Sequence, residues 1–309
     1  MRTAAVRADL MLLVVAALWG AGFVAQKDAM DHMGPFAFNG ARYAIGVVLL
    51  ACPVFLRKKK GLSLRTLIGG GALGLVMFAA AGLQQTGIVT AEASRAAFLT
   101  GLYVILTPAL GLLFRQTITR GHLLGGALAI IGLAMLARGE ADAWSNLLEG
   151  LSIGDWLVLA CALAWALHVV LTGHYALKAD PLALAWSQFV TVAALSLGAS
   201  FLRETASPAD LARDIASGWM PLLYSGIFVI ALAFTLQIVA QRDAPPAHAA
   251  VLMSLEAVFG ALFGVLLLRE SLNAWELAGC GVMFAGMLAS QLHRGRRTEA
   301  DRAVPIEPV

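Results

Sequence analysis

The sequence predicts an all-α membrane protein with ten transmembrane helices, arranged as two inverted repeats of five helices each. Three observations support this fold class. The chain of 309 residues is 60% hydrophobic and only 13% charged, with a mean hydropathy of +0.79, and no water-soluble domain of this size has such a composition. The apolar residues fall into ten runs long enough to cross a bilayer. The two halves of the chain also repeat the same marker residues at the same spacing.

The predicted spans follow one another with mostly short polar connections. A helix of about 20 apolar residues crosses the roughly 30 Å hydrocarbon layer. By this measure the spans are residues 10–29, 34–56, 67–88, 94–114, 121–137, 154–175, 182–202, 218–240, 247–268 and 275–292. The first span resembles a signal peptide, but it has a counterpart in the second half. We therefore interpret it as a span that is retained.

The lysines and arginines predict the orientation of the chain. With the amino terminus in the cytoplasm and ten crossings, 15 of these residues lie in inner segments and six in outer segments. This distribution follows the positive-inside rule. We expect a multi-pass protein of the cell inner membrane with both termini in the cytoplasm. The remaining basic residue, Arg42, falls inside the second span.

The sequence divides into two repeats and a tail. The predicted repeats cover residues 1–140 and 154–293. The tail, residues 294–309, is charged and contains proline, so we expect it to be disordered and to lie against anionic lipids. A second long connection contains Ser207-Pro208-Ala209-Asp210, which predicts a short surface helix with a serine N-cap.

Marker residues recur in both halves at matching intervals. The first set recurs at one constant offset, with Arg42 corresponding to Gln188: Asp9, Trp19 and Pro35 match Asp155, Trp165 and Pro181. Later in each half, Ala96-Ala97-Phe98-Leu99 parallels Ala249-Ala250-Val251-Leu252, and Gly125 and Gly132 parallel Gly279 and Gly286. Five spans is an odd number, so the second repeat is inverted in the membrane. Many secondary transporters have this architecture, with the substrate site near the midplane at the repeat interface.

Short motifs at both ends of the chain resemble one known family. Leu18-Trp19-Gly20, followed by Pro35 and Arg42, resembles the opening of the drug/metabolite transporter superfamily, in its ten-helix EamA-type branch. The closing signature of that family is similar to Glu256-Ala257-Val258-Phe259 with Arg269-Glu270-Ser271-Leu272 and Gly279. The resemblance covers residues 9–292. It departs at Ala257, where the family usually has proline, and at Arg115-Gln116, where a Gly-Glu pair is common. The resemblance implies export or uptake of small metabolites through a central cavity.

Glu256 is the main candidate for a functional residue. It is an isolated acid near the middle of the apolar run 247–268. An ionised carboxylate at this depth costs about 2.5–3.5 kcal/mol on the insertion scale, so it should face a protein interior or a water-filled cavity. We expect Glu256 to be protonated for part of a transport cycle and to exchange its proton through the cavity.

Other polar residues near helix centres are predicted to line the same cavity or to bind a neighbouring helix. The candidates for substrate binding or coupling, besides Glu256, are Trp19, Tyr103, His168, Arg42, Gln84, Gln188 and Gln237. Interhelical hydrogen bonding is the more frequent use of buried glutamine and histidine, although His168 also suits proton transfer. Trp19 lines the cavity or fills space between helices, and Arg42 binds a carboxylate or extends toward the outer surface.

Small residues and interfacial residues have predicted structural roles. Three pairs spaced for close helix contact are Gly70-x-x-x-Gly74, Gly121-x-x-x-Gly125 and Gly260-x-x-x-Gly264. Cys52, Cys161 and Cys280 lie in separate apolar spans, so we expect them to be small buried residues without a disulfide or a metal. His248 begins the ninth span and is expected at the cytoplasmic membrane interface.

The sequence has no convincing enzyme signature. It contains neither a Walker A motif nor His-Glu-x-x-His. The segment 150–154 matches the letters of a nucleophile elbow, but it is a loop that enters a membrane helix. We therefore predict no enzymatic activity, no cofactor and no metal. The predicted function is secondary transport of an amino acid or drug-like solute by alternating access, with proton coupling left open.

The alternative function is an intramembrane enzyme acting on a lipid or peptide, for which Ser94, Thr100 and His168 are the available groups. The predicted partners are a small-molecule substrate and the lipid bilayer, without nucleic acid. Formation of a homodimer is left open.

Overall fold

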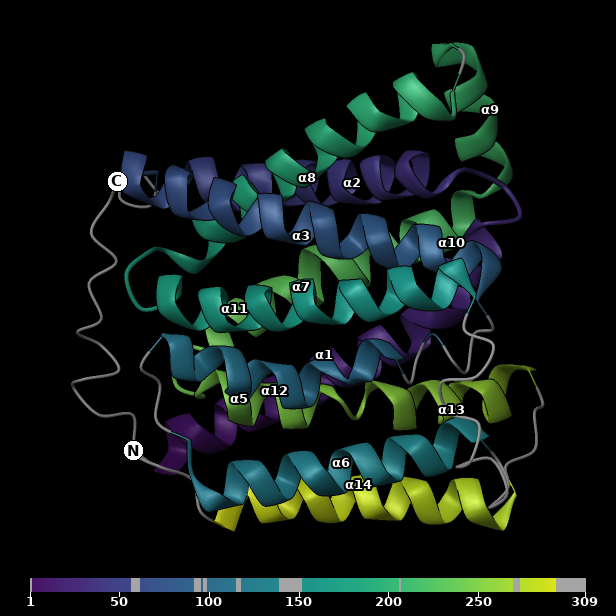
Figure 1. Cartoon of the computed structure of the whole chain (residues 1–309). Coiled ribbons are helices and arrows are strands. Elements are labelled where there is room, and N and C mark those ends of the chain that lie inside the picture. Colours follow the sequence, from purple (N-terminus) through teal and green to yellow (C-terminus); the bar gives the residue numbers. More distant parts are fainter. Residues whose placement is uncertain are drawn as a thin grey trace.

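The chain folds into long helices that lie roughly side by side (Figure 1). This computed structural model describes residues 2–56, 62–91, 96, 99–114, 118–138, 152–205, 207–268 and 273–292, and these residues contain no strand. Ser94, the Arg115-Gln116 position, the motif 269–272 and the tail 294–309 lie outside the described residues.

The first half of the chain supplies five labelled helices, each at the position of a predicted span. They are α1 (Arg2–Ala29), α2 (Pro35–Leu56), α3 (Leu64–Thr90), α5 (Tyr103–Leu113) and α6 (Arg120–Arg138). The second half begins with α7 (Ile153–Tyr175) and α8 (Pro181–Arg203) and ends with α14 (Ala274–Leu292). The sequence thus located these apolar helices to within a few residues, except at the amino termini of α1 and α5.

Two predicted spans of the second half are built from several pieces. The eighth span consists of α10 (Trp219–Tyr224), the π-helical segment η2 (Ser225–Phe234) and α11 (Thr235–Ala240). The ninth span consists of α12 (Pro246–Met253) and α13 (Glu256–Leu268). A π-helix has a wider turn than an α-helix and is often found at functional sites. Periodicity alone did not indicate either irregularity.

The helices fit a multi-pass membrane protein. Among the described residues, seven helices are long and apolar enough to cross a membrane, and three shorter apolar helices cover Leu99–Leu113, Arg120–Met135 and Ala274–Ser290. These three lie where the remaining spans were predicted. The count of ten crossings stays a prediction.

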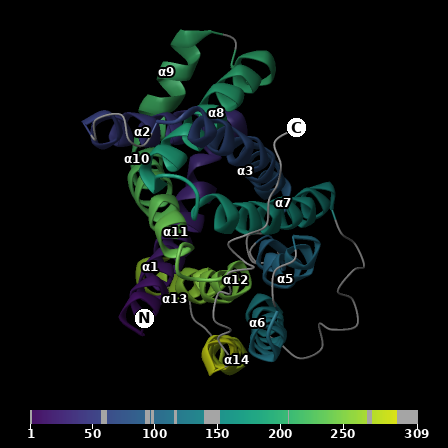
Figure 2. The same ribbon diagram turned by 90° about the vertical axis from the view of Figure 1, so that its left-hand side faces the viewer.

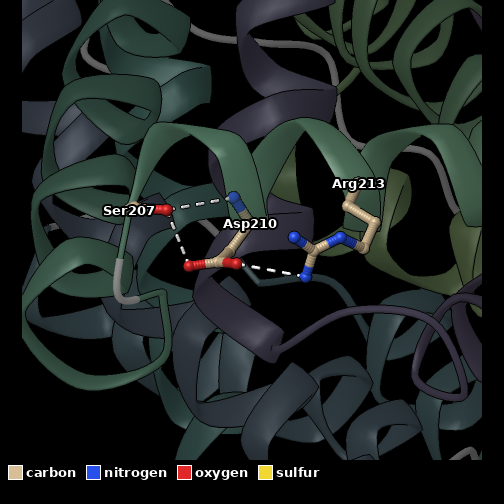
Figure 3. Close-up of polar contacts among 3 residues, drawn as sticks. All are labelled: Ser207, Asp210 and Arg213. Atoms are coloured by element: carbon tan, nitrogen blue, oxygen red, sulfur yellow. Dashed lines mark hydrogen bonds and ion pairs between the residues drawn. The ribbon is translucent and has the colours of Figure 1, made fainter.

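A short exposed helix follows α8 in the chain, as the sequence predicted. It is α9 (Pro208–Ser217), which has no buried residues and begins with Pro208 after the N-cap Ser207. The Ser207 hydroxyl accepts from the Asp210 backbone amide at 3.3 Å and donates to its carboxylate at 2.7 Å, and Arg213 pairs with the same carboxylate at 3.1 Å (Figure 3). These local bonds satisfy groups that a helix start otherwise leaves unpaired.

The two repeats are interlocked, because the main helix contacts run between them. Helix α6 packs on α14, α2 on α8, α3 on both α7 and α8, and α1 on α13. The α6–α14 pair lies at one edge of the molecule, and the group of α2, α3 and α8 lies at the other (Figures 1 and 2). Neither repeat therefore has a core of its own.

Glycines allow the closest of these helix contacts. A Cβ atom added at Gly125 would lie 2.8 Å from the Gly286 carbonyl, and one at Gly132 would lie 2.5 Å from the Gly279 carbonyl. Gly125 is equivalent to Gly279, and Gly132 is equivalent to Gly286. Exchanging the two repeats therefore converts the first contact into the second, as expected for repeats related by a two-fold axis. The predicted contact role of Gly70 and Gly74 is also confirmed, since both meet α8.

Two tips of the structure carry further detail. The Glu204 carboxylate, just after α8, accepts from the backbone amides of Phe36 at 3.0 Å and Ala37 at 2.8 Å, and so caps α2 from the other repeat. At the opposite end of α8, Asp180 caps its own helix.

The expected burial of the cysteines is confirmed for Cys161 and Cys280 but is wrong for Cys52, which is exposed.

Candidate functional site

The ninth span is interrupted directly before Glu256. Helix α12 ends at Met253, a turn covers Ser254 and Leu255, and Glu256 is the first residue of α13. Its side chain is 6% exposed. The start of a helix carries a partial positive charge that stabilises an anion. Membrane transporters use such half-helix ends at their substrate and ion sites, so the local fold supports a charged or polar role for Glu256.

The fourth span shows the same arrangement at Tyr103. A turn at Leu102 precedes helix α5, whose first residue is Tyr103. The separation between Tyr103 and Glu256 equals that between Ala96 and Ala249, so the two residues occupy equivalent positions in the repeats. Both side chains line the same cavity. The fold therefore brings two equivalent helix breaks together at one cavity.

The cavity lies between helices of both repeats. It has a volume of about 50 Å³, which is enough for a few water molecules and below the roughly 300–1,000 Å³ of typical drug-binding sites. Its lining residues are Trp19, Phe23, Gln26, Arg42, Tyr43, Gln84, Thr100, Tyr103, Trp165, Val169, Val229, Phe234, Gln237 and Glu256. This size favours a small solute.

Six of the eight predicted site residues meet in this cavity, namely Trp19, Arg42, Gln84, Tyr103, Gln237 and Glu256. The other two, His168 and Gln188, lie outside the lining and are fully buried. His168 Nε2 and Gln188 Oε1 are 3.1 Å apart, so this pair forms the interhelical hydrogen bond that the sequence left as one alternative. His168 is separated from the cavity by aromatic rings, since its ring contacts both Trp165 and Phe234.

An aromatic cluster forms one wall of the cavity. The Phe234 ring lies between the equivalent tryptophans, with centroid distances of 4.8 Å to Trp19 and 5.7 Å to Trp165. Sequence reasoning missed Phe234 because it is one of many apolar residues in its span. Its position at the end of the π-helical segment η2 sets where it points. The wall suits an apolar or cationic part of a solute.

Two glutamines in the lining bond to other side chains of the protein. Gln84 accepts from Trp165 Nε1 at 3.3 Å and donates to Thr100 at 3.4 Å. Gln237 donates to Gln241 at 3.1 Å, while its own carbonyl oxygen is buried without a partner. Gln84 is therefore held in place by the protein, and Gln237 keeps one acceptor that a solute can use.

Several buried donors in the lining also have no protein partner. These atoms are Trp19 Nε1, Arg42 Nε and the Tyr43 hydroxyl. The Tyr103 hydroxyl interacts with the Glu256 carboxyl group. Buried polar groups are nearly always hydrogen-bonded, and leaving one unpaired costs about 1–3 kcal/mol. Such a concentration of donors around one cavity points to water or a ligand as the missing acceptor.

Arg42 is buried and does not extend toward the surface. Its side chain is 3% exposed, and its guanidinium lies over the rings of Phe38 and Tyr43 at 4.7 and 5.5 Å. Within the described part of the chain, no carboxylate forms an ion pair with it and no group accepts a hydrogen bond from it. The snorkelling alternative is therefore wrong for Arg42.

A second polar cluster lies away from the cavity. His248 Nδ1 is 2.9 Å from the Ser290 hydroxyl, and His248 Nε2 is 2.9 Å from an Asp9 carboxylate oxygen. His248 was expected at the membrane interface, but it is fully buried because α1, α12 and α14 enclose it. Among the described residues, no group of three or more His, Cys, Asp or Glu side chains is arranged to hold a metal ion.

Sequence comparison agrees with the repeated architecture. The family model of the EamA-like transporters matches the chain twice, over residues 6–138 and 152–290. The chain belongs to the EamA-like transporter family. The predicted family resemblance is thus confirmed, and the two-repeat architecture of the EamA fold applies to this chain.

Individual relatives cover nearly the whole EamA-type chain. An uncharacterized transporter of Archaeoglobus fulgidus is 31% identical over 92% of this chain and 86% of its own length. A probable amino-acid metabolite efflux pump of Salmonella typhimurium is 25% identical over 93% of this chain and 96% of its own. A solved crystal structure shares the fold with a TM-score of 0.75, at 17% identity over 92% of this chain and 96% of that one.

Proposed function

We propose that the protein is a secondary transporter that moves a small metabolite through the central cavity by alternating access. The observation that carries this proposal is the cavity itself, because helices of both repeats line it and two helix breaks meet there. Transport requires a site that either side can reach in turn, and breaks in membrane helices provide such sites. The membership in the EamA-like family supports a membrane transporter.

The substrate is a small solute such as an amino acid. The cavity volume of about 50 Å³ favours a small metabolite over a drug-like one, since drug-sized ligands occupy roughly 300–1,000 Å³. The name of the Salmonella typhimurium relative, a probable amino-acid metabolite efflux pump, supports the same class. The transport cycle is coupled to protons through Glu256, whose neutral form is the cheaper one in a buried site.

The protein lies in the inner membrane with both termini in the cytoplasm. The excess of lysine and arginine in the predicted inner segments supports this orientation. The lipid bilayer and the solute are its partners. Measuring the mass of the purified protein would show whether it forms a homodimer.

The enzyme alternative has one supporting constellation, which is the chain Ser290–His248–Asp9. A serine, a histidine and an aspartate in this order resemble a hydrolytic triad. However, Ser290 and His248 are fully buried and lie outside the cavity lining. A lipid or peptide bond could not reach the Ser290 hydroxyl in this arrangement, so transport is the better proposal.

Two measurements test the transport proposal. Metabolite profiles of cells with and without the gene should differ in at least one small solute, and purified protein in liposomes should move that solute across the membrane. Val229→Phe, which fills the cavity, should block the flux. Phe228→Trp, on the exposed side of the same segment, should leave it intact. Equal flux through both variants, or no flux from the wild type for any solute, would overturn the proposal.

A further inference from the structure

The cavity lining is largely built from equivalent positions of the two repeats. The spacing between the repeats pairs Trp19 with Trp165, Phe23 with Val169, Gln84 with Gln237 and Tyr103 with Glu256, and both members of every pair line the cavity. Such a lining presents similar chemistry from both sides. The positions at which the two sides differ in charge therefore decide which solute the cavity can orient.

Among the described residues, the lining contains two charged side chains. In each case the equivalent position in the other repeat has an uncharged residue. Glu256 is equivalent to the neutral Tyr103, and Arg42 is equivalent to the neutral Gln188. One charge is positive and comes from the first repeat, whereas the other is negative and comes from the second. The described structure contains no ion pair between them. The cavity is therefore electrically polar.

The repeats also explain why Arg42 is free to act on a ligand. Gln188 is bound by His168 at 3.1 Å within the second repeat. The position equivalent to His168 in the first repeat is Gly22, which has no side chain to bind Arg42. The planar guanidinium has five N–H donors suited to a carboxylate, and at 3% exposure it finds no acceptor among the described residues.

The lining around Glu256 suits a cation. Glu256 lines the same cavity as the aromatic wall of Trp19, Trp165 and Phe234. A carboxylate and the faces of aromatic rings both attract an ammonium group. The Tyr43 hydroxyl, which has no partner among the described residues, can supply a further hydrogen bond to the solute.

We propose that Arg42 and Glu256 are the specificity-determining pair of this site, and that they select a zwitterionic solute by holding its carboxylate at Arg42 and its ammonium group at Glu256. This inference rests on the proposed transport function and specifies its substrate class. It assigns Arg42 a ligand, whereas a purely structural Arg42 would depend only on its contacts with Phe38 and Tyr43.

Two matched sets of small compounds test the assignment. L-valine, isobutylamine and 3-methylbutanoate share one apolar tail, and L-phenylalanine, phenethylamine and 3-phenylpropanoate share another. Binding of each compound to the purified full chain is measured by calorimetry or by competition. In the wild type, the zwitterion of at least one set should bind about tenfold more tightly than its amine and its acid, as expected for one extra charge-assisted contact.

The variants give opposite patterns if the assignment is right. Arg42→Gln, which installs the residue found at the equivalent position, should weaken binding of the zwitterion and the acid about tenfold and leave binding of the amine unchanged. Glu256→Gln should weaken binding of the zwitterion and the amine and leave binding of the acid unchanged. Arg42→Lys keeps the charge and should restore part of the acid binding. Arg203→Gln, at an exposed helix end, should change none of them.

The failure of this inference differs from a failure of the transport proposal. If Arg42→Gln weakens all three compounds equally, or lowers thermal stability together with all binding, Arg42 is structural and the inference is wrong. If the wild type transports a solute without a carboxylate and Arg42→Gln transports it equally well, the transport proposal is supported and the specificity assignment is wrong. If the wild type moves no solute at all, the transport proposal itself fails.

Discussion

At the scale of single residues, Glu256 combines three properties that rarely occur together. It is an acid within an apolar span, it is nearly fully buried, and it is the first residue of a helix that faces a cavity. Burying an acid within a membrane span costs free energy, so such residues are usually retained for function. Proton exchange during the transport cycle is the use that we infer.

Glu256→Gln tests this role. The amide keeps the shape and much of the hydrogen bonding, but it cannot titrate. We expect the variant to reach the membrane and to retain solute exchange in liposomes at saturating solute concentration, while net transport driven by a proton gradient is abolished. The measurement is flux across a pH series for both proteins.

The matched control is Glu276→Gln, an acid in the first turn of α14 that lies outside the cavity lining. It should behave as the wild type does. A Glu256→Gln protein with full gradient-driven transport and an unchanged pH profile would make Glu256 a structural residue.

Trp19 allows a second test of the cavity. Its indole lines the cavity and packs against Phe234, and its N–H has no protein partner. We expect Trp19→Ala to reduce transport about tenfold or more, while the amount of protein in the membrane stays close to normal. Trp156→Ala, at an exposed position, serves as the control. A collapse of abundance specific to Trp19→Ala would show that packing is its main role.

The sequence predicted the cavity position of some residues and missed that of others, for a physical reason. Glu256, Trp19 and Tyr103 were predictable because polar or amphipathic groups at midplane depth are costly and therefore informative. Phe234 and Tyr43 were not, since an aromatic residue in an apolar span gives no signal of which way it points. His168 and Gln188 satisfy each other, and such pairing depends on helix rotation that the sequence does not show.

At the scale of elements, the close helix contacts depend on glycine. The sequence predicted the contact faces because small residues recur at helical spacing. It did not predict the π-helical segment η2 or the break before Glu256. Neighbouring helices approach both irregularities closely, as at Gly20, where an added Cβ atom would lie 2.6 Å from the Glu256 carbonyl oxygen.

Gly132→Val tests the α6–α14 contact. An added Cβ atom would meet the Gly279 carbonyl at 2.5 Å, so the helices must separate. We expect a loss of about 1–3 kcal/mol in stability, typical of overpacking, and a lower melting temperature in detergent. Gly281→Val is the matched control, because an added Cβ atom there meets nothing within 4 Å. Equal melting temperatures for the two variants would contradict the contact.

At the scale of the whole molecule, the ten-span inverted topology remains to be tested. Reporter fusions at Ala143 and Ser207 should report the periplasm, and fusions at Gly61 and Thr298 should report the cytoplasm. The reason is the distribution of lysine and arginine, which follows the positive-inside rule. A carboxy terminus in the periplasm would be incompatible with ten crossings from a cytoplasmic amino terminus.

The interlocked repeats lead to a further prediction. Residues 1–145 and 146–309, produced as separate chains, should each be degraded when expressed alone, because their main helix contacts lie in the other half. Co-expression should restore both fragments and part of the transport. The measurement is membrane abundance of each fragment with and without its partner. A first fragment that is stable by itself would mean that the first repeat has a sufficient core.

The close approach of Gly20 to Gly260 also has a consequence for biosynthesis. These two backbones touch in the finished molecule, yet a ribosome that adds roughly 5–20 residues per second needs about 12–48 s to pass from the first to the second. During this interval the early helices are already inserted while their partners have not been made. The membrane proteases and chaperones therefore meet this chain as a half-packed first repeat, and that transient form is where a packing defect in α1 or α2 would first be recognised.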